Sequence, residues 1–289
     1  MTSSGDAALL TIARDIATRA GELALRRRRE GVEVAASKSS PEDIVTHTDR
    51  ETEDLIRQAL QDVRPDDGFL GEESEGTSGT SGLTWVVDPI DGTVNFLYGI
   101  PAWAVSIAVV EGEADPLTWT ARAGCVVNPT LGEVYTATAG GGSALDGRPL
   151  AVNAGVPLSL ALVGTGFSYG AEKRMQQGRV ITDLLGEVRD IRRIGAASLD
   201  LCNVAAGRAD AYFERGLKPW DHAAGALIAA EAGARVTGID GGPASAELLI
   251  AADPELARAL EDRLERLRGR IAPPASSRIP RVARIPSSG

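Results

Sequence analysis

The stretch WVVDPIDGTVNF, residues 85–96, ends an apolar run with two carboxylates three residues apart. The apolar letters predict a strand buried on both faces, and active sites in α/β architectures favour the end of such a strand. Pro89 ends the strand ladder because proline has no N–H to donate. The turn that follows can swing Asp91 back toward Asp88 and direct the Ile90 carbonyl inward. The two carboxylates then repel each other unless something neutralises them.

The Gly-Thr pair after Asp91 suggests that the neutralised site binds an anion. Gly92 allows a close approach of backbone, and the N–H groups of Gly92 and Thr93 would face an anion at a helix start. A plain aspartate-rich turn with a helix cap explains the same letters. The pattern D-x-x-D-G-T alone leaves both interpretations open.

Two further acidic sites accompany this turn. Glu72, in the motif GEES, ends another short apolar run, and Asp221 begins the strongly apolar stretch WDHAAGALIAA. Asp221 also suits a helix N-cap, and the two roles are compatible. His47 and His222 are the only histidines, so a histidine-rich zinc or iron site is not expected.

Such an all-oxygen set selects hard cations, above all Mg²⁺, which usually recruits substrate phosphate oxygens as further ligands. The four acids Glu72, Asp88, Asp91 and Asp221 carry four negative charges, which two Mg²⁺ ions would neutralise. Paired metal ions can hold both the attacking water and the leaving oxygen of an in-line displacement. The spacing therefore predicts metal-assisted phosphate chemistry.

Composition limits the partners and the compartment. The chain has 289 residues, 43% of them hydrophobic, and a formal net charge of -10, which disfavours nucleic acid and anionic membranes as general partners. Cys125 and Cys202 lie in apolar runs and are predicted to be buried free thiols in a reducing cytosol. We see neither an apolar span of about 18 residues nor a signal peptide, so we expect a cytoplasmic protein.

Hydrophobic periodicity predicts mixed α and β structure in two domains. Helices are expected over residues 8–23, from a capping box of Thr48 and Glu51 onward, and over residues 254–267. Residues 102–138 show the pattern of several β-strands separated by turns. After residue 160, predicted strands alternate with predicted helices. The pattern places a domain boundary near residue 152. Residues 271–289 are expected to form a disordered tail.

The motifs WVVDPIDGTVNF, GEES and KPWDHAAGALIAAEAG together resemble the inositol monophosphatase family, closest to its bacterial SuhB-type members, over about Lys38 to Val236. The resemblance implies a layered αβαβα sandwich of the inositol monophosphatase and fructose-1,6-bisphosphatase type. It implies an N-terminal α+β domain at residues 1–152 that carries most metal ligands and an α/β domain at 153–270. It further implies two to three Mg²⁺ ions, inhibition by Li⁺ and a homodimer. The implied metal ligands are Glu72, Asp88, the Ile90 carbonyl, Asp91 and Asp221.

The resemblance also implies roles for the remaining site residues. Asp49 and Thr93 would activate the attacking water, with Glu72 near the third metal, and the backbone of Gly92 and Thr93 would hold the phosphate. Glu214 would accept hydrogen bonds from substrate hydroxyls. Other residues implied to contact the substrate are Asp91, Ala196 and Asp221. Lys38 matches a mobile loop near the metals, although a plain surface lysine remains an alternative.

The predicted function is Mg²⁺-dependent hydrolysis of inositol 1-phosphate to inositol and phosphate. The alternatives are a related phosphatase acting on fructose 1,6-bisphosphate, histidinol phosphate or adenosine 3′,5′-bisphosphate, or a regulatory binding protein of transcription. A nucleotide substrate stays open because four arginines lie near the predicted pocket, namely Arg192, Arg193, Arg208 and Arg215.

Overall fold

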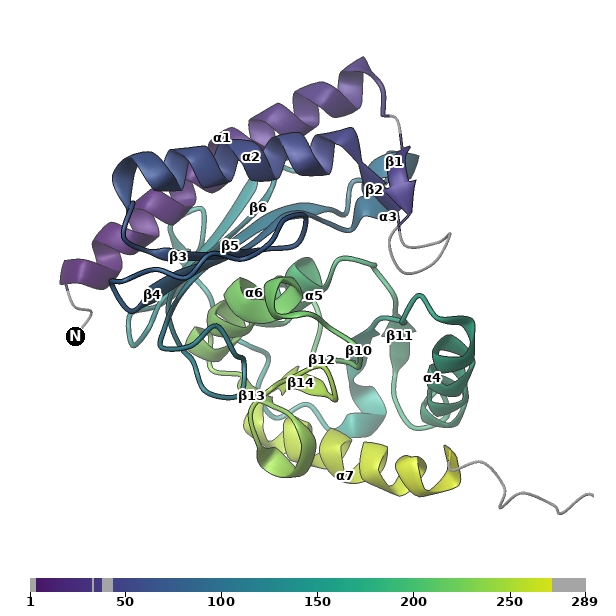
Figure 1. Ribbon diagram of the computed structural model, residues 1–289. Coiled ribbons are helices and arrows are strands. Elements are labelled where there is room, and N and C mark those ends of the chain that lie inside the picture. Colours follow the sequence, from purple (N-terminus) through teal and green to yellow (C-terminus); the bar gives the residue numbers. More distant parts are fainter. Residues whose placement is uncertain (1–3, 33, 38–43, 272–289) are drawn as a thin grey trace, which may run out of the picture.

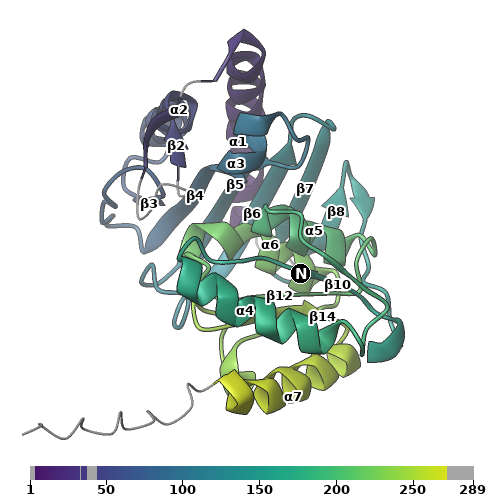
Figure 2. The ribbon, with the colours of Figure 1, turned by 90° about the vertical axis from the view of Figure 1, so that its right-hand side faces the viewer.

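The computed structural model describes residues 4–32, 34–37 and 44–271, which form the five layers αβαβα (Figures 1 and 2). Helices alternate with two β-sheets from one end of the molecule to the other, so the predicted sandwich is confirmed. The predictions made for Lys38 and for the tail beyond Ile271 lie outside the described residues.

The first two layers are a pair of helices on a seven-stranded sheet. Helices α1 (Ser4–Glu30) and α2 (His47–Val63) cover its outer face, and short strands β1 (Val34–Ser37) and β2 (Ile44–Thr46) connect them. The sheet has the order β3-β4-β5-β6-β7-β8-β9, with β3 and β4 parallel and the other neighbours antiparallel. The strands are β3 (Gly68–Gly71), β4 (Leu83–Asp91), β5 (Ala104–Glu111), β6 (Thr120–Asn128), β7 (Glu133–Thr138), β8 (Gly142–Leu145) and β9 (Arg148–Pro149).

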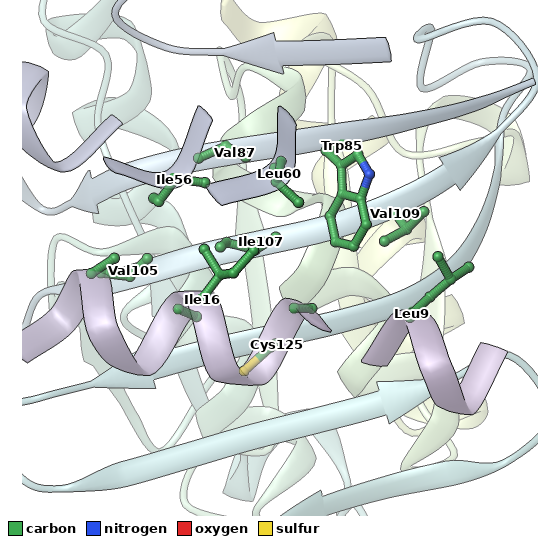
Figure 3. Packing of buried hydrophobic residues seen from close by; sticks show 14 of the residues in the cluster. Leu9, Ile16, Ile56, Leu60, Trp85, Val87, Val105, Ile107, Val109 and Cys125 are labelled. Atoms are coloured by element: carbon green, nitrogen blue, oxygen red, sulfur yellow. The ribbon is translucent and has the colours of Figure 1, made fainter. Parts of the chain in front are cut away.

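Strand alternation explains why helices pack on both faces of this sheet. Trp85, Val87, Ile107 and Val109 point toward α1 and α2 and are fully buried there, as Figure 3 shows. The residues that alternate with them along the strands point to the other face of the sheet and are buried against the third layer. Both faces of β4 and β5 are therefore apolar, as the sequence of β4 predicted.

The third layer is the helix pair α5 (Ala197–Ala205) and α6 (Pro219–Glu231), packed between the two sheets. Helix α6 touches β6 so closely that a side chain at Gly124 would lie 3.1 Å from Ala224 Cα. The apolar character of α6 on almost every face, seen in the sequence, follows from this central position.

The last two layers are a five-stranded sheet and its outer helices. The strand order is β11-β10-β12-β14-β13, with β10 parallel to both neighbours and β14 antiparallel to both of its own. The strands are β10 (Leu162–Thr165), β11 (Asp190–Arg192), β12 (Ala211–Glu214), β13 (Arg235–Thr237) and β14 (Leu249–Ala252). The outer helices are α4 (Ala171–Leu184) and α7 (Pro254–Ile271), with 3₁₀ turns η1 (Leu158–Leu160) and η2 (Ile239–Gly241).

Several sequence predictions can be compared directly with these elements. Cys125 and Cys202 are free and buried, as predicted. The capping box of α2 was predicted at the wrong pair: Thr46 is the N-cap and Asp49 its partner, not Thr48 and Glu51. No helix in the described part of the chain combines the length and apolarity needed to cross a bilayer. The domain boundary near residue 152 stays a prediction.

Candidate active site

The predicted site residues converge on one cavity of about 720 Å³, which we call the acidic cavity. It opens between the two sheets, where the end of β4, the starts of α5 and α6 and the end of β12 come together. Among the predicted site residues within the described part of the chain, Asp49 alone does not line it. Those that do are Glu72, Asp88, Ile90, Asp91, Gly92, Thr93, Ala196, Glu214 and Asp221.

An irregularity in β4 places Asp88 and Asp91 together. Asp88 pairs with Ser106 and Asp91 with Ala104, so the ladder to β5 shifts between the two aspartates. The Ile90 N–H donates to Asp88 Oδ1 at 3.1 Å, which closes the turn. The chain then enters α3 (Thr93–Tyr98) through Gly92, whose φ of 89° favours glycine. The DPIDG sequence therefore sets the backbone conformation of this turn and also supplies its two carboxylates.

Asp91 is fixed by the other half of the molecule. Ser198, in the first turn of α5, donates to Asp91 Oδ2 from its backbone N–H at 2.7 Å and from its Oγ at 2.5 Å. Burial raises the pKa of Asp91 to about 6, although the two Ser198 bonds favour its charged form. Ser198 thus positions a predicted metal ligand, a role that the sequence analysis missed.

Thr93 and Asp49 form the second feature of the site. Thr93 Oγ1 lies 3.2 Å from Asp49 Oδ1 and 3.1 Å from the Ile90 carbonyl oxygen, both of which can accept its proton. The other Asp49 oxygen accepts from the Thr46 backbone N–H at 2.8 Å and from the Thr46 hydroxyl. Burial raises the pKa of Asp49 to about 6. The cap of α2 therefore also orients the carboxylate that faces Thr93.

Asp221 belongs to the first turn of α6 rather than to its cap. Lys218 is the N-cap residue, and its backbone N–H donates to Asp221 Oδ2 at 2.6 Å. The predicted N-cap at Asp221 was wrong because Pro219 starts the helix two residues earlier, at a position where proline is favoured. Burial, then the charges of Glu72 and Asp91, raise the pKa of Asp221.

The ionisation of Asp88, Asp91 and Asp221 is opposed by burial and by neighbouring carboxylates. Burial raises the pKa of Asp88 well above its ordinary value, and the charges of Glu72, Asp91 and Asp221 raise it further. Among the described residues no three His, Cys, Asp or Glu side chains are arranged so that they could hold a metal ion. The donors nevertheless fit Mg²⁺ by their chemistry, since all are oxygens and the carboxylates of Asp88 and Asp91 are buried. Binding would require these side chains to turn toward the ion.

Glu214 lies at the end of β12 and lines the acidic cavity. Tyr212 OH donates to Glu214 Oε2 at 2.5 Å, and burial raises the pKa of Glu214 to about 7. A side chain at Gly166 would lie 1.9 Å from that same oxygen, so Gly166 leaves room for the carboxylate. Behind them lies the buried Asp200, whose pKa burial and Glu214 raise. Neither Tyr212 nor Asp200 was identified from the sequence.

Only two of the four arginines noted in the sequence line the acidic cavity, where two lysines join them. Arg193 and Arg215 line it, together with Lys173 and Lys218. The other two arginines of the segment face elsewhere: Arg192 pairs with Asp190, and Arg208 pairs with Glu133. Arg193 is near enough to Glu214 to favour its charged form, whereas Asp91 opposes it.

The raised pKa values predict that the metal-free protein loses stability as pH rises. Asp49 and Glu214 have folded pKa values of about 6 and about 7, against ordinary values of 3.8 and 4.5. Such groups favour folding while protonated, and their contribution is lost as pH rises through the folded pKa. One pKa unit is about 1.4 kcal/mol, which shifts Tm by roughly 3–6 °C in a chain of this size. In chelator we expect Tm to fall by at least about 3 °C between pH ~5 and pH ~8.

Thermal melts of wild type and Glu214→Gln across this range check the prediction. The variant cannot ionise at this position, so its Tm should fall less than that of wild type. A Tm that rises with pH in both proteins would contradict it.

Comparison with known proteins gives an independent assignment of the chain. Residues 6–272 match the inositol monophosphatase family. An inositol-1-monophosphatase of Mycobacterium bovis is 46% identical over 263 residues, which cover 87% of this chain and 88% of that protein. A Pseudomonas aeruginosa protein named Nus factor SuhB is 40% identical over 240 residues, covering 81% and 86%. The crystal structure of the extragenic suppressor protein SuhB from Bartonella henselae has a TM-score of 0.80 and 36% identity, covering 89% of this chain and 98% of that one.

Proposed function

Because the chain belongs to the inositol monophosphatase family and is a phosphatase, we propose that it hydrolyses inositol 1-phosphate to inositol and phosphate with Mg²⁺. The observation that carries the proposal is the acidic cavity itself. Four acids, of which Asp88 and Asp91 are buried, face this one space together with the Gly92–Thr93 backbone, and the Thr93–Asp49 pair supports it. Glu214 stands on another part of its wall, where the alcohol part of a substrate would lie.

Glu72, Asp88, the Ile90 carbonyl, Asp91 and Asp221 would hold Mg²⁺. When bound, the ions would supply positive charge that acidifies water and offsets the charge of the phosphate. Backbone N–H groups already fix one oxygen each of Asp88, Asp91 and Asp221, which leaves the other oxygen of each to turn toward an ion. These bonds limit how far each carboxylate can turn.

Thr93 and Asp49 would orient and deprotonate the attacking water. Thr93 Oγ1 can donate its one proton to Asp49 and keep its lone pairs for a water proton. Asp49 has a pKa of about 6, close to the range in which a general base works best near neutral pH. The two Thr46 bonds hold Asp49 in place while its other oxygen faces Thr93.

Phosphate release measured across a substrate panel tests the proposal. The panel contains inositol 1-phosphate, histidinol phosphate, fructose 1,6-bisphosphate and adenosine 3′,5′-bisphosphate. We expect inositol 1-phosphate to have the highest kcat/KM, and activity to disappear in excess chelator and return with Mg²⁺. Hydrolysis that persists unchanged in chelator would refute the metal requirement, and a preference for another ester would replace the substrate assignment.

Magnesium should also stabilise the folded protein. A ligand that binds only the folded state adds about 2.7 kcal/mol at a hundredfold excess over Kd. We expect Tm to rise by roughly 5–10 °C at saturating Mg²⁺, given about 2–4 °C per kcal/mol. Calcium-free buffers with added NaCl at equal ionic strength provide the control. A rise of the same size with NaCl would indicate general screening instead of a site.

A regulatory role in transcription is the second candidate, favoured by the relative named Nus factor SuhB. Affinity capture from cells, performed with wild type and with Asp88→Asn, separates the roles. Partners retained by the variant would support a role independent of catalysis. The cytoplasmic location and the homodimer remain predictions, and light scattering after gel filtration tests the latter.

A further inference from the structure

A second cavity of about 420 Å³ adjoins the acidic cavity, and we call it the side cavity. It lies among α4, the ends of β10 and β12, and α7, which the two ribbon views place next to one another (Figures 1 and 2). The two cavities share several lining residues, namely Gly166, Ser168, Lys173, Glu214, Arg215 and Gly216. The side cavity is therefore continuous with the space in which the substrate alcohol would lie.

The walls of the side cavity are chemically unlike those of the acidic cavity. Val180 and Ile181 of α4, Phe213 of β12 and Leu264 of α7 contribute apolar surface. A polyol hydroxyl placed against these side chains would lose water without gaining a hydrogen-bond partner. An apolar group would gain from leaving water. The inositol ring has no group suited to this space.

Gln177 of α4 lines the side cavity and bonds to two of the residues that both cavities share. Its Oε1 accepts from the Ser168 N–H at 2.8 Å, and its Nε2 donates to the Arg215 carbonyl at 3.1 Å. Gln177 therefore ties α4 to the loops that follow β10 and β12. The Ser168 N–H and the Arg215 carbonyl are thereby paired within the protein, so an apolar group beside them would not leave these two groups unpaired.

We propose that the side cavity binds an apolar group, preferably an aromatic ring, carried by the alcohol part of a phosphomonoester. This inference rests on the proposed phosphatase function and extends its substrate class beyond simple polyol phosphates. The phosphate would lie at Gly92 and Thr93, the alcohol carbons would pass Glu214, and the ring would contact Val180 and Phe213. A cavity of this volume is within the usual range for small-molecule sites.

Matched pairs of esters test the inference with the full-length, Mg²⁺-loaded protein. Phenylalkyl phosphates with two, three and four methylenes are each compared with the alkyl phosphate of the same chain length. The leaving groups are alike, so a difference reports contacts of the ring. We expect at least one phenylalkyl ester to show a kcat/KM about tenfold or more above its partner, since a single methylene in an apolar pocket already changes kcat/KM by about 10- to 200-fold.

Substitutions assign the effect to the side cavity. Val180→Phe fills it from α4 and Ala246→Leu fills it from the opposite wall, so both should reduce the ester ratio toward one. Met175→Phe is the matched control, because Met175 lies on α4 but is 66% exposed and does not line the cavity. The ratio should persist in this control.

Failure of the inference differs from failure of the proposed function. If inositol 1-phosphate is hydrolysed but no ring-bearing ester is preferred, the side cavity does not bind the ring. A preference that survives both filling substitutions also refutes it, because the ring then binds elsewhere. If no ester of either series and no inositol phosphate is hydrolysed, the phosphatase proposal fails and the inference fails with it.

Discussion

An Asp88→Asn variant is expected to hydrolyse inositol 1-phosphate about 100- to 1,000-fold more slowly than wild type, the usual effect of losing one preorganised electrostatic group. The same variant should melt at a higher temperature than wild type in chelator. Asp88 is buried, and its ionised form is opposed by burial and by Glu72, Asp91 and Asp221. Asparagine keeps the oxygen that accepts the Ile90 N–H but removes one of these like charges.

The two expected effects have opposite signs, which separates loss of function from loss of folding. Thermal melts with and without Mg²⁺, together with phosphate release, measure both. The increase of Tm caused by Mg²⁺ should be smaller in Asp88→Asn than in wild type. Glu113→Gln removes one exposed charge and is the control. Equal Mg²⁺ shifts in wild type and Asp88→Asn would mean that Asp88 does not contact the ion.

The sequence predicted those site residues whose positions follow from local signals. The carboxylates of β4 come at the end of an apolar strand, and Asp221 stands at the start of an apolar helix. The carboxyl end of a strand and the N-terminus of a helix are both places where polar groups commonly line a cavity. The layered fold itself came from the resemblance, because periodicity alone indicated only mixed α and β structure.

The supporting residues were not predictable in this way. Ser198 and Asp91 are 107 positions apart, and an ordinary serine in a helix start carries no sign of its partner. In the sequence Tyr212 and Asp200 resemble ordinary core residues of a strand and a helix. Only the fold places them beside Glu214. Closely spaced polar residues also make caps ambiguous. Thr46 and Thr48 each have an acid three residues later, and only the backbone conformation shows that Thr46 is the N-cap.

A Glu214→Ala variant is expected to lose about 10- to 150-fold in kcat/KM on inositol 1-phosphate, with a much smaller loss on ethyl phosphate. Glu214 stands at the end of β12 and offers carboxylate oxygens to the acidic cavity. Hydrogen bonds to a charged group contribute roughly 1.5–3 kcal/mol, and about 1.4 kcal/mol corresponds to a factor of ten. Ethyl phosphate has no hydroxyl groups for this carboxylate to accept from.

The ratio of kcat/KM for inositol 1-phosphate to kcat/KM for ethyl phosphate distinguishes a substrate-binding role of Glu214 from a structural one. Removing the carboxylate also leaves the Tyr212 hydroxyl without its acceptor, so a purely structural effect would disturb the wall of the cavity for every ester. Both kcat/KM values would then fall together, and Tyr212→Phe would produce the same uniform loss. If Glu214 binds the polyol, inositol 1-phosphate alone should suffer the large loss in Glu214→Ala, because only its hydroxyls lose a partner. If neither substrate is affected, the ring lies against another wall, and the assignment of inositol 1-phosphate loses its main structural support.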